Sequence, residues 1–283
     1  MPNRSEIDAR LNAACDMADQ ARLLTGPAYR RGLVAENKNL ENTDLENKNL
    51  ANVFDPVTKA DKDAEKLLRN LIEKSCPGDS IVGEEYPDKI GDNDWSWCLD
   101  PIDGTRAFVA GVPVWGTLIA VSYRDEPVIG IIDHPALKER YIGVLNDMGG
   151  KAWREDAYGT APLKTQTCAK LNDAVLSCTE PMAMLSRGQL AAYEMIRRTA
   201  RFTRLGLDAY GYALTAAGRI DLVIEAGLAP YDIQSHIPII KGAGGAVTTW
   251  HGGNAKNGGA IVCAGDPRLL DQVYPYLQRA MDS

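Results

Sequence analysis

A short apolar run that ends in two closely spaced carboxylates is the most constraining feature of this sequence. Residues 95–99 (WSWCL) are followed by the segment Asp100–Thr105 (DPIDGT). The apolar run predicts a strand. Pro101 is expected to end its pairing, so that Asp100 emerges at the strand end and Asp103 turns the chain. Two carboxylates held at one point repel each other, and burying them is costly unless a cation lies between them. The segment therefore predicts a cation site at a strand end.

The chemistry of the same segment favours phosphate binding. Carboxylate oxygens, with water in the remaining coordination positions, suit Mg²⁺. Gly104 and Thr105 leave backbone N–H groups at the start of Arg106–Phe108, where an anion can bind if that segment is helical. A plain turn is the alternative for this motif taken alone, so the interpretation depends on the other acidic segments.

Two acidic segments upstream fit the same interpretation. Residues 81–85 (IVGEE) read as a short strand that ends at Glu84 and Glu85, for which a solvated loop is the alternative. Asp61 stands at the start of a predicted helix over Asp61–Ser75, whose apolar residues recur at helical spacing. An aspartate at such a start is normally an N-cap, a role that does not exclude a catalytic one.

Acidic residues downstream also fall at the starts of predicted helices. Asp232 follows a strand over Leu222–Glu225 and directly precedes a helix over Ile233–Gly242. Asp208 begins a predicted helix over Asp208–Ala217. The alternative for both aspartates is an N-cap. Each acidic segment could be a turn, a loop or an N-cap when it is taken alone. It is improbable that all of them have only such structural roles in one chain.

These segments together resemble the inositol monophosphatase-like superfamily of Mg²⁺-dependent phosphomonoesterases. The resemblance runs from about Ile7 to Tyr276, and its matching residues are Pro56–Asp61 with Glu65, Gly83–Glu85, Asp100–Thr105, and Tyr231–Asp232 followed by Gly242–Gly245. Within the superfamily, four stretches are most similar to the bacterial histidinol-phosphate phosphatase branch: 103–108 (DGTRAF), 114–119 (VWGTLI), 231–234 (YDIQ) and 237–240 (IPII).

The resemblance implies a role for each site residue. Glu84, Asp100 and the Ile102 carbonyl would hold a first Mg²⁺, and Asp100, Asp103 and Asp232 a second, with Glu85 supporting a third and weaker ion. Asp61 would accept a proton from the attacking water through the Thr105 hydroxyl, which is general base catalysis. The catalytic set is then Asp61, Thr105 and Glu84, and the backbone N–H groups of Gly104 and Thr105 would hold the phosphate.

The expected substrate follows from charge in the pocket. By resemblance, Glu225 lies at the spacing from Asp232 where the superfamily places a substrate-facing acid, and Asp208 adds a second carboxylate. Histidinol phosphate carries an ammonium group and an imidazole, so two carboxylates would attract it. Arg204 is expected to reach a phosphate or to pair with one of these acids, with a surface position as the alternative.

The sequence therefore predicts hydrolysis of L-histidinol phosphate to L-histidinol and phosphate. The alternatives are inositol-1-phosphate, which offers only neutral hydroxyls, and 3′-phosphoadenosine 5′-phosphate, which would require more lysines or arginines near the cleft. A non-catalytic, metal-binding regulatory protein is the alternative from another functional class. Such a protein would be expected to lack Asp61, Thr105 or a shared metal ligand, and all of these are present.

The order of elements predicts a mixed α+β and α/β fold. A helix over Glu6–Leu24 precedes strand-like runs at 117–123, 128–132 and 141–145, spaced as in an antiparallel sheet. A seam is expected from Gly149 to about Lys170, after which strands alternate with helices. The resemblance implies a layered αβαβα sandwich with a subdomain over 1–150 that carries most metal ligands and a second over 151–283 that completes the site.

A five-residue unit in triplicate interrupts this pattern at residues 36–50 (ENKNLENTDLENKNL). Leucines five residues apart match neither a helical stripe nor strand alternation, and three copies are too few for a solenoid. We interpret the segment as an expanded loop beside the active site. The superfamily usually places a lysine just before the Pro-Val-Thr segment, and Lys48 is the better candidate, with Lys38 as its duplicate.

Composition excludes several other classes. The net charge of −7 comes without basic tracts, which argues against nucleic-acid binding. No apolar run approaches the roughly 20 residues of a membrane span, and six scattered cysteines without a C-x-x-C pair predict reduced thiols and a cytoplasmic protein. The three histidines lack metal-ligand spacing. A homodimer is expected by resemblance.

Overall fold

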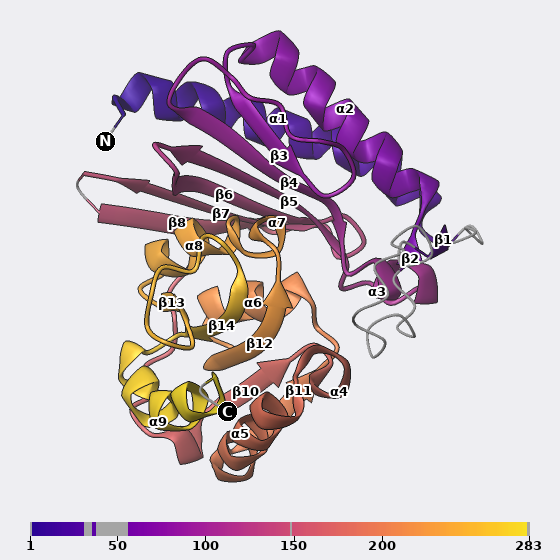
Figure 1. Cartoon of the computed structure of the whole chain (residues 1–283). Helices are drawn as coiled ribbons and strands as arrows, with labels where there is room; N and C mark the ends of the chain where they lie inside the picture. Colours follow the sequence, from indigo (N-terminus) through magenta and orange to yellow (C-terminus); the bar gives the residue numbers. More distant parts are fainter. Residues whose placement is uncertain (1, 31–35, 38–55, 148, 282–283) are drawn as a thin grey trace.

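Two β-sheets and three layers of helices alternate in this computed structural model, which describes residues 2–30, 36–37, 56–147 and 149–281 (Figure 1). Helices α1 (Arg4–Ala28) and α2 (Lys59–Ser75) cover the outer face of the first sheet. Helices α6 (Ala209–Ala216) and α8 (His236–Gly242) lie between the two sheets. Helices α5 (Arg187–Thr199) and α9 (Leu270–Met281) cover the second sheet. The predicted αβαβα sandwich is confirmed.

The first sheet has seven strands in sequential order from β3 to β9. Their bounds are β3 Ser80–Gly83, β4 Trp95–Asp103, β5 Gly116–Tyr123, β6 Glu126–His134, β7 Glu139–Asn146, β8 Gly149–Asp156 and β9 Gly159–Pro162. Strand β3 is parallel to β4, and every later pair is antiparallel. Short connections join the antiparallel strands from β5 onward, whereas α3 lies between β4 and β5.

The second sheet has the order β11-β10-β12-β14-β13. Its bounds are β10 Val175–Cys178, β11 Phe202–Leu205, β12 Leu222–Leu228, β13 Ala246–Thr249 and β14 Gly259–Ala264. Strand β10 is parallel to both neighbours, whereas β14 is antiparallel to both of its own. The remaining elements are the strand pair β1 (Glu36–Asn37) and β2 (Pro56–Val57), and the short helices α3 (Thr105–Ala110), α4 (Pro181–Met184) and α7 (Pro230–Ile233). Two 3₁₀ turns cover 171–173 and 267–269.

Three local expectations need correction. Pro101 does not end the pairing of β4: the strand continues to Asp103 through a register shift against β5, because a bulge absorbs the residue that cannot donate to the ladder. The expected seam from Gly149 begins with strands β8 and β9, so the first sheet extends to Pro162. The helix expected from Ile233 is two short helices, α7 and α8. Strand β11 was not predicted.

The N-cap alternative is wrong for Asp61 and Asp232, whereas Asp208 does occupy the N-cap position of α6. Asp61 lies at the third position of α2, where its carboxylate bonds back to the true N-cap, Thr58. Asp232 holds the same position in α7 and bonds back to Ala229. Asp208 precedes α6, but its side chain makes no capping hydrogen bond. A capping box places the carboxylate beside the helix entrance with one oxygen left for other contacts.

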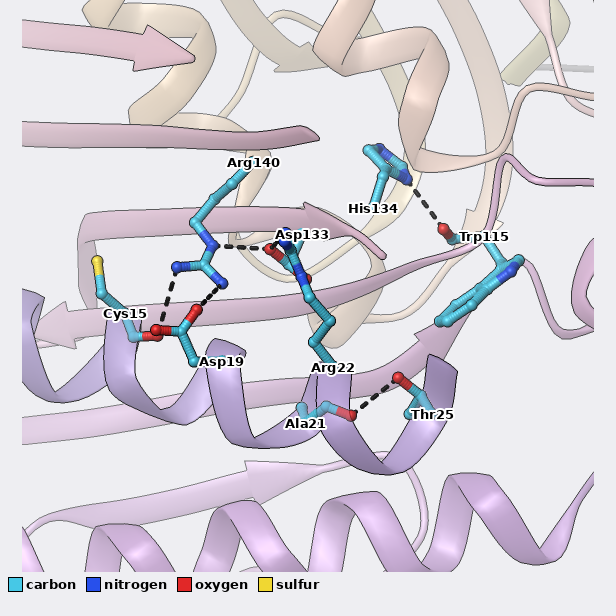
Figure 2. A network of polar contacts seen from close by, with 9 residues as sticks. All are labelled: Cys15, Asp19, Ala21, Arg22, Thr25, Trp115, Asp133, His134 and Arg140. Atoms are coloured by element: carbon cyan, nitrogen blue, oxygen red, sulfur yellow. Dashed lines mark hydrogen bonds and ion pairs between the residues drawn. The ribbon is translucent and has the colours of Figure 1, made fainter. Parts of the chain in front are cut away.

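Helix α1 is tied to the first sheet by a buried ion-pair network (Figure 2). The fully buried Asp133 on β6 accepts hydrogen bonds from Arg22 at 2.6 Å and from Arg140 at 2.7 Å. Arg140 on β7 also donates to Asp19 of α1 at 2.6 Å. Two carboxylates, Asp133 and Asp19, therefore offset the charges of two guanidinium groups at the helix–sheet junction. Among the described helices, none has the length and apolar character needed to cross a bilayer.

We expect Asp133→Asn to destabilise the protein by about 3 kcal/mol, because it leaves the Arg140 guanidinium buried without its main counter-charge. Urea denaturation measures the change. Asp94→Asn is the matched control, since it removes a carboxylate from an exposed pair with Arg124, and it should unfold at the wild-type midpoint. Equal midpoints for both variants would contradict a stabilising role for the network.

Candidate active site

A cleft of about 660 Å³ opens between the two sheets, where β4 and α3 face α6, β12 and α7. The first half of the chain contributes Glu84 at the end of β3 and the segment from Asp100 to Thr105. The second half contributes Asp208, Glu225 and Asp232. Acidic residues that are up to 148 positions apart in the sequence therefore line one cavity.

Three of these residues form a compact carboxylate centre. Asp100, Asp103 and Asp232 each present an oxygen within 4.8 Å of the others. Burial raises the pKa of Asp100 well above its usual value, and the charges of Glu84 and Asp103 raise it further. Burial also raises the pKa of Asp103. Several hard oxygen donors whose charges repel one another fit a divalent cation such as Mg²⁺, which would remove the repulsion.

Asp61 and Thr105 lie together beside this centre, as predicted. Asp61 is fully buried, and one of its carboxylate oxygens accepts hydrogen bonds from the Thr58 backbone N–H at 2.8 Å and from the Thr58 hydroxyl at 2.5 Å. The Thr105 hydroxyl lies 3.4 Å from the other oxygen and 3.1 Å from the Ile102 carbonyl. Burial raises the pKa of Asp61, which suits a residue that must accept a proton.

The loop that carries Glu84 is anchored to α2 by a pair that the sequence interpretation did not explain. The buried Glu65 accepts a hydrogen bond from the Glu85 backbone N–H at 2.7 Å and from Arg69 at 2.7 Å. Arg69 donates further to the two carbonyls of residues 86–87. The i, i+4 spacing of Glu65 and Arg69 is the sequence signal for this pair. Glu85 itself is not among the described residues that line the cleft.

Gly104 has a left-handed backbone conformation that favours glycine, and its surroundings leave little room for a side chain. Its φ is +74°, and a Cβ there would lie 3.0 Å from the carboxyl carbon of Asp208. Gly104 immediately precedes α3, so the segment after the motif is helical and begins at Thr105, which meets the condition set for anion binding. The backbone N–H groups at this helix start remain the predicted phosphate contact.

The opposite wall holds the two predicted substrate-facing acids. Glu225 is buried, and it accepts hydrogen bonds from the Thr179 backbone N–H and hydroxyl at 2.9 and 2.6 Å and from the Tyr212 hydroxyl at 2.8 Å. Asp208 has a φ of +48°, which is strained for a residue with a side chain. Burial, together with the nearby charge of Glu225, raises the pKa of Asp208 to about 6.

Arg204, a predicted substrate contact, is not brought into the cleft. Arg204 lies exposed on the edge strand β11 and is not among the described lining residues. Lys48 and Lys38 fall outside the described residues, as does most of the 36–50 repeat.

Sequence reasoning missed an ion pair at the cleft. Arg106 donates to Glu180 at 2.7 Å, and both residues line the cavity. Arg106 directly follows the DPIDGT motif, which is a usable signal, whereas Glu180 lies in a loop that no motif marks. His236 also lines the cleft and is buried; burial lowers its pKa to about 3, so the ring is neutral near pH 7.

Asp208→Asn should stabilise the metal-free protein at pH 7.5. A carboxyl whose folded pKa is raised penalises the folded state above that pKa, and the penalty disappears below the unfolded value. The advantage of the variant should therefore shrink as the pH falls through about 6 and vanish near 3.8. Thermal unfolding of both proteins in EDTA across this pH range measures the stability difference. A stability difference that is independent of pH would contradict the raised pKa of Asp208.

Comparison with known proteins agrees with this geometry. Residues 7–282 match the family model described as the inositol monophosphatase family. The bifunctional phosphatase IMPL2 of Arabidopsis thaliana is 44% identical over 70% of this chain, which spans 55% of that protein. The histidinol-phosphatase of Streptomyces coelicolor is 33% identical over 79% of this chain and 84% of its own length. An inositol-1-monophosphatase of Mesorhizobium japonicum is 32% identical over 75% and 79%.

Solved structures show the same fold. An inositol monophosphatase from Zymomonas mobilis superposes with a TM-score of 0.78 at 34% identity, over 98% of this chain and all of that one. The suhB protein from Bartonella henselae superposes with a TM-score of 0.80 at 24% identity, over 96% and 99%. The matched family model, the fold and the acidic cleft together show that this chain belongs to the inositol monophosphatase family.

Proposed function

We propose that this chain is a Mg²⁺-dependent phosphomonoesterase that hydrolyses L-histidinol phosphate to L-histidinol and phosphate. Membership of a phosphatase family gives the reaction class. The observation that carries the substrate proposal is the pair Asp208 and Glu225 on the wall opposite the predicted phosphate contact. These carboxylates favour a leaving group with an ammonium group and a titratable imidazole. Histidinol-phosphatases among the similar proteins support this proposal.

In the proposed mechanism, Glu84, Asp100, the Ile102 carbonyl, Asp103 and Asp232 would hold two Mg²⁺ ions. Those ions would neutralise the phosphate oxygens and lower the pKa of the attacking water. Thr105 orients that water, and Asp61 takes its proton through the Thr105 hydroxyl. The backbone N–H groups of Gly104 and Thr105 donate to the phosphate as the ester P–O bond breaks, and the leaving alkoxide takes up a proton from solvent to give the alcohol. Glu85 and Lys48 keep their predicted auxiliary roles.

Inositol-1-phosphate is the second candidate substrate. Named inositol monophosphatases at 32% and 34% identity favour it. It would place neutral hydroxyls against Asp208 and Glu225. A nucleotide bisphosphate fits less well, because Arg106 is the sole lysine or arginine among the described lining residues. A homodimer, a cytoplasmic location and the lack of a nucleic-acid partner stay predictions.

Paired variants separate metal binding from proton transfer. Asp100→Asn should abolish Mg²⁺ binding and turnover, because Asp100 is expected to be shared by two ions. Asp61→Asn should keep Mg²⁺ binding and lower kcat by roughly 10²–10⁴-fold, the usual contribution of a general base. Isothermal titration calorimetry and phosphate release measure the two effects. Loss of Mg²⁺ binding in the Asp61 variant would contradict its assigned role.

The substrate is tested by phosphate release with Mg²⁺ from three esters at equal concentration: L-histidinol phosphate, inositol-1-phosphate and 3′-phosphoadenosine 5′-phosphate. We expect kcat/KM to favour histidinol phosphate about a hundredfold, which is roughly 2.7 kcal/mol of discrimination in the transition state. A preference for inositol-1-phosphate would reject the proposed substrate and keep the reaction class. Absence of release from all three would favour the non-catalytic alternative.

A further inference from the structure

The cleft carries more carboxylates than a metal centre requires. Besides the predicted ligands, it is lined by Glu180, Asp208 and Glu225. Among the described lining residues, Arg106 is the one lysine or arginine that can offset them. Once divalent ions neutralise the metal ligands, this wall keeps an excess of negative charge. A leaving group with a positive charge is therefore favoured over a neutral one.

The three carboxylates differ in how firmly their neighbours hold them. Glu225 is buried and accepts three hydrogen bonds, so its position is fixed. Asp208 packs against Gly104 in a strained backbone conformation. Glu180 is different, because 53% of its side chain is exposed, and the ion pair described for it is with Arg106. Glu180 is thus the carboxylate whose partner can be exchanged most readily.

The Arg106–Glu180 pair joins the two sides of the cleft. Arg106 lies on α3, which follows β4 of the first sheet, and Glu180 directly precedes α4, which follows β10 of the second. Exposed ion pairs are weak, because water competes for both charges. The backbone beside Glu180 is held firmly, since the neighbouring Thr179 donates two hydrogen bonds to Glu225. A second cation could therefore replace the guanidinium on Glu180 through side-chain movement alone.

We propose that Glu180 is a specificity-determining residue that binds the positively charged end of the leaving group, and that Arg106 competes with the substrate for it. This inference rests on the proposed function, because it places the phosphate at the carboxylate centre. A cationic leaving group takes the Glu180 carboxylate from Arg106. A neutral leaving group makes no such exchange, and the Arg106–Glu180 pair stays closed.

The test compares cationic and neutral esters of similar size: phosphoethanolamine with ethyl phosphate, and histidinol phosphate with inositol-1-phosphate. The readout is the ratio of kcat/KM, cationic over neutral. Glu180→Gln should lower this ratio about threefold to fivefold, mainly through KM, which is the range of an exposed ion pair. Arg106→Gln should raise the ratio by a similar factor, because effects on the common phosphate group cancel.

Glu194→Gln is the matched control, because Glu194 pairs with Arg197 on the surface of α5 and does not line the cleft. It should leave the ratio unchanged. The KM of the cationic ester should also rise with ionic strength in the wild type, and less in Glu180→Gln, because salt screens an exposed attraction. A merely structural role for Glu180 would not produce this salt dependence.

The outcomes separate this inference from the proposed substrate. Equal losses for both esters in Glu180→Gln, or a ratio equal to that of Glu194→Gln, would overturn the role of Glu180 even if histidinol phosphate is preferred. A general preference for cationic esters that depends on Glu180, without a preference for histidinol phosphate, would reject the proposed substrate and support this inference. A wild-type enzyme that prefers the cationic ester in neither pair would overturn both.

Discussion

Like-charge repulsion in the cleft is the constraint on which the rest of the site depends. Asp100, Asp103 and Asp232 present oxygens within 4.8 Å of one another. Each accepts a backbone hydrogen bond, from Ile102, Ala209 and Ala229 respectively. Because the backbone fixes these carboxylates, rotation of the side chains away from one another would break those bonds. A divalent cation would remove the repulsion without that loss, so the proposed metal site uses the same geometry that costs stability in the absence of the cation.

The surrounding fold keeps this geometry in place from several directions. The bulge in β4 lets Asp100 and Asp103 lie at one strand end, and the Glu65–Arg69 pair on α2 holds the neighbouring loop. Asp133 connects α1 to the strands of the same sheet. Binding sites need supporting groups that are themselves held by packing and hydrogen bonds. Of these contacts, the Glu65–Arg69 pair acts most directly on the site, because it fixes the loop that carries Glu84.

A site can be predicted from the sequence when its functional residues lie close together along the chain. The segment Asp100–Thr105 was interpretable because its carboxylates, glycine and helix start lie within six residues. The αβαβα layers followed from strand and helix periodicity together with the family resemblance. The prediction that Pro101 ends the strand pairing was wrong. A bulge depends on the partner strand, and the periodicity of one segment does not reveal that partner. The N-cap alternative for Asp61 and Asp232 was wrong by three positions, since an acid at a helix start fits both the N-cap and the third helical position.

Contacts between distant segments were beyond the reach of the sequence. Glu180 meets Arg106 across 74 residues, and no spacing rule links them. Arg204 was assigned to the pocket from its neighbours in sequence, whereas its strand forms the edge of the second sheet. Both features depend on tertiary structure, so the local sequence pattern could not predict them.

Anomalous diffraction from crystals soaked in Mn²⁺ would test the central claim most directly, because Mn²⁺ shares the oxygen-ligand preference of Mg²⁺ and can be located by its own signal. The account predicts a peak between the carboxylates of Asp100, Asp103 and Asp232, and a second beside Glu84. A cleft without a peak, or metal bound only elsewhere, would contradict it.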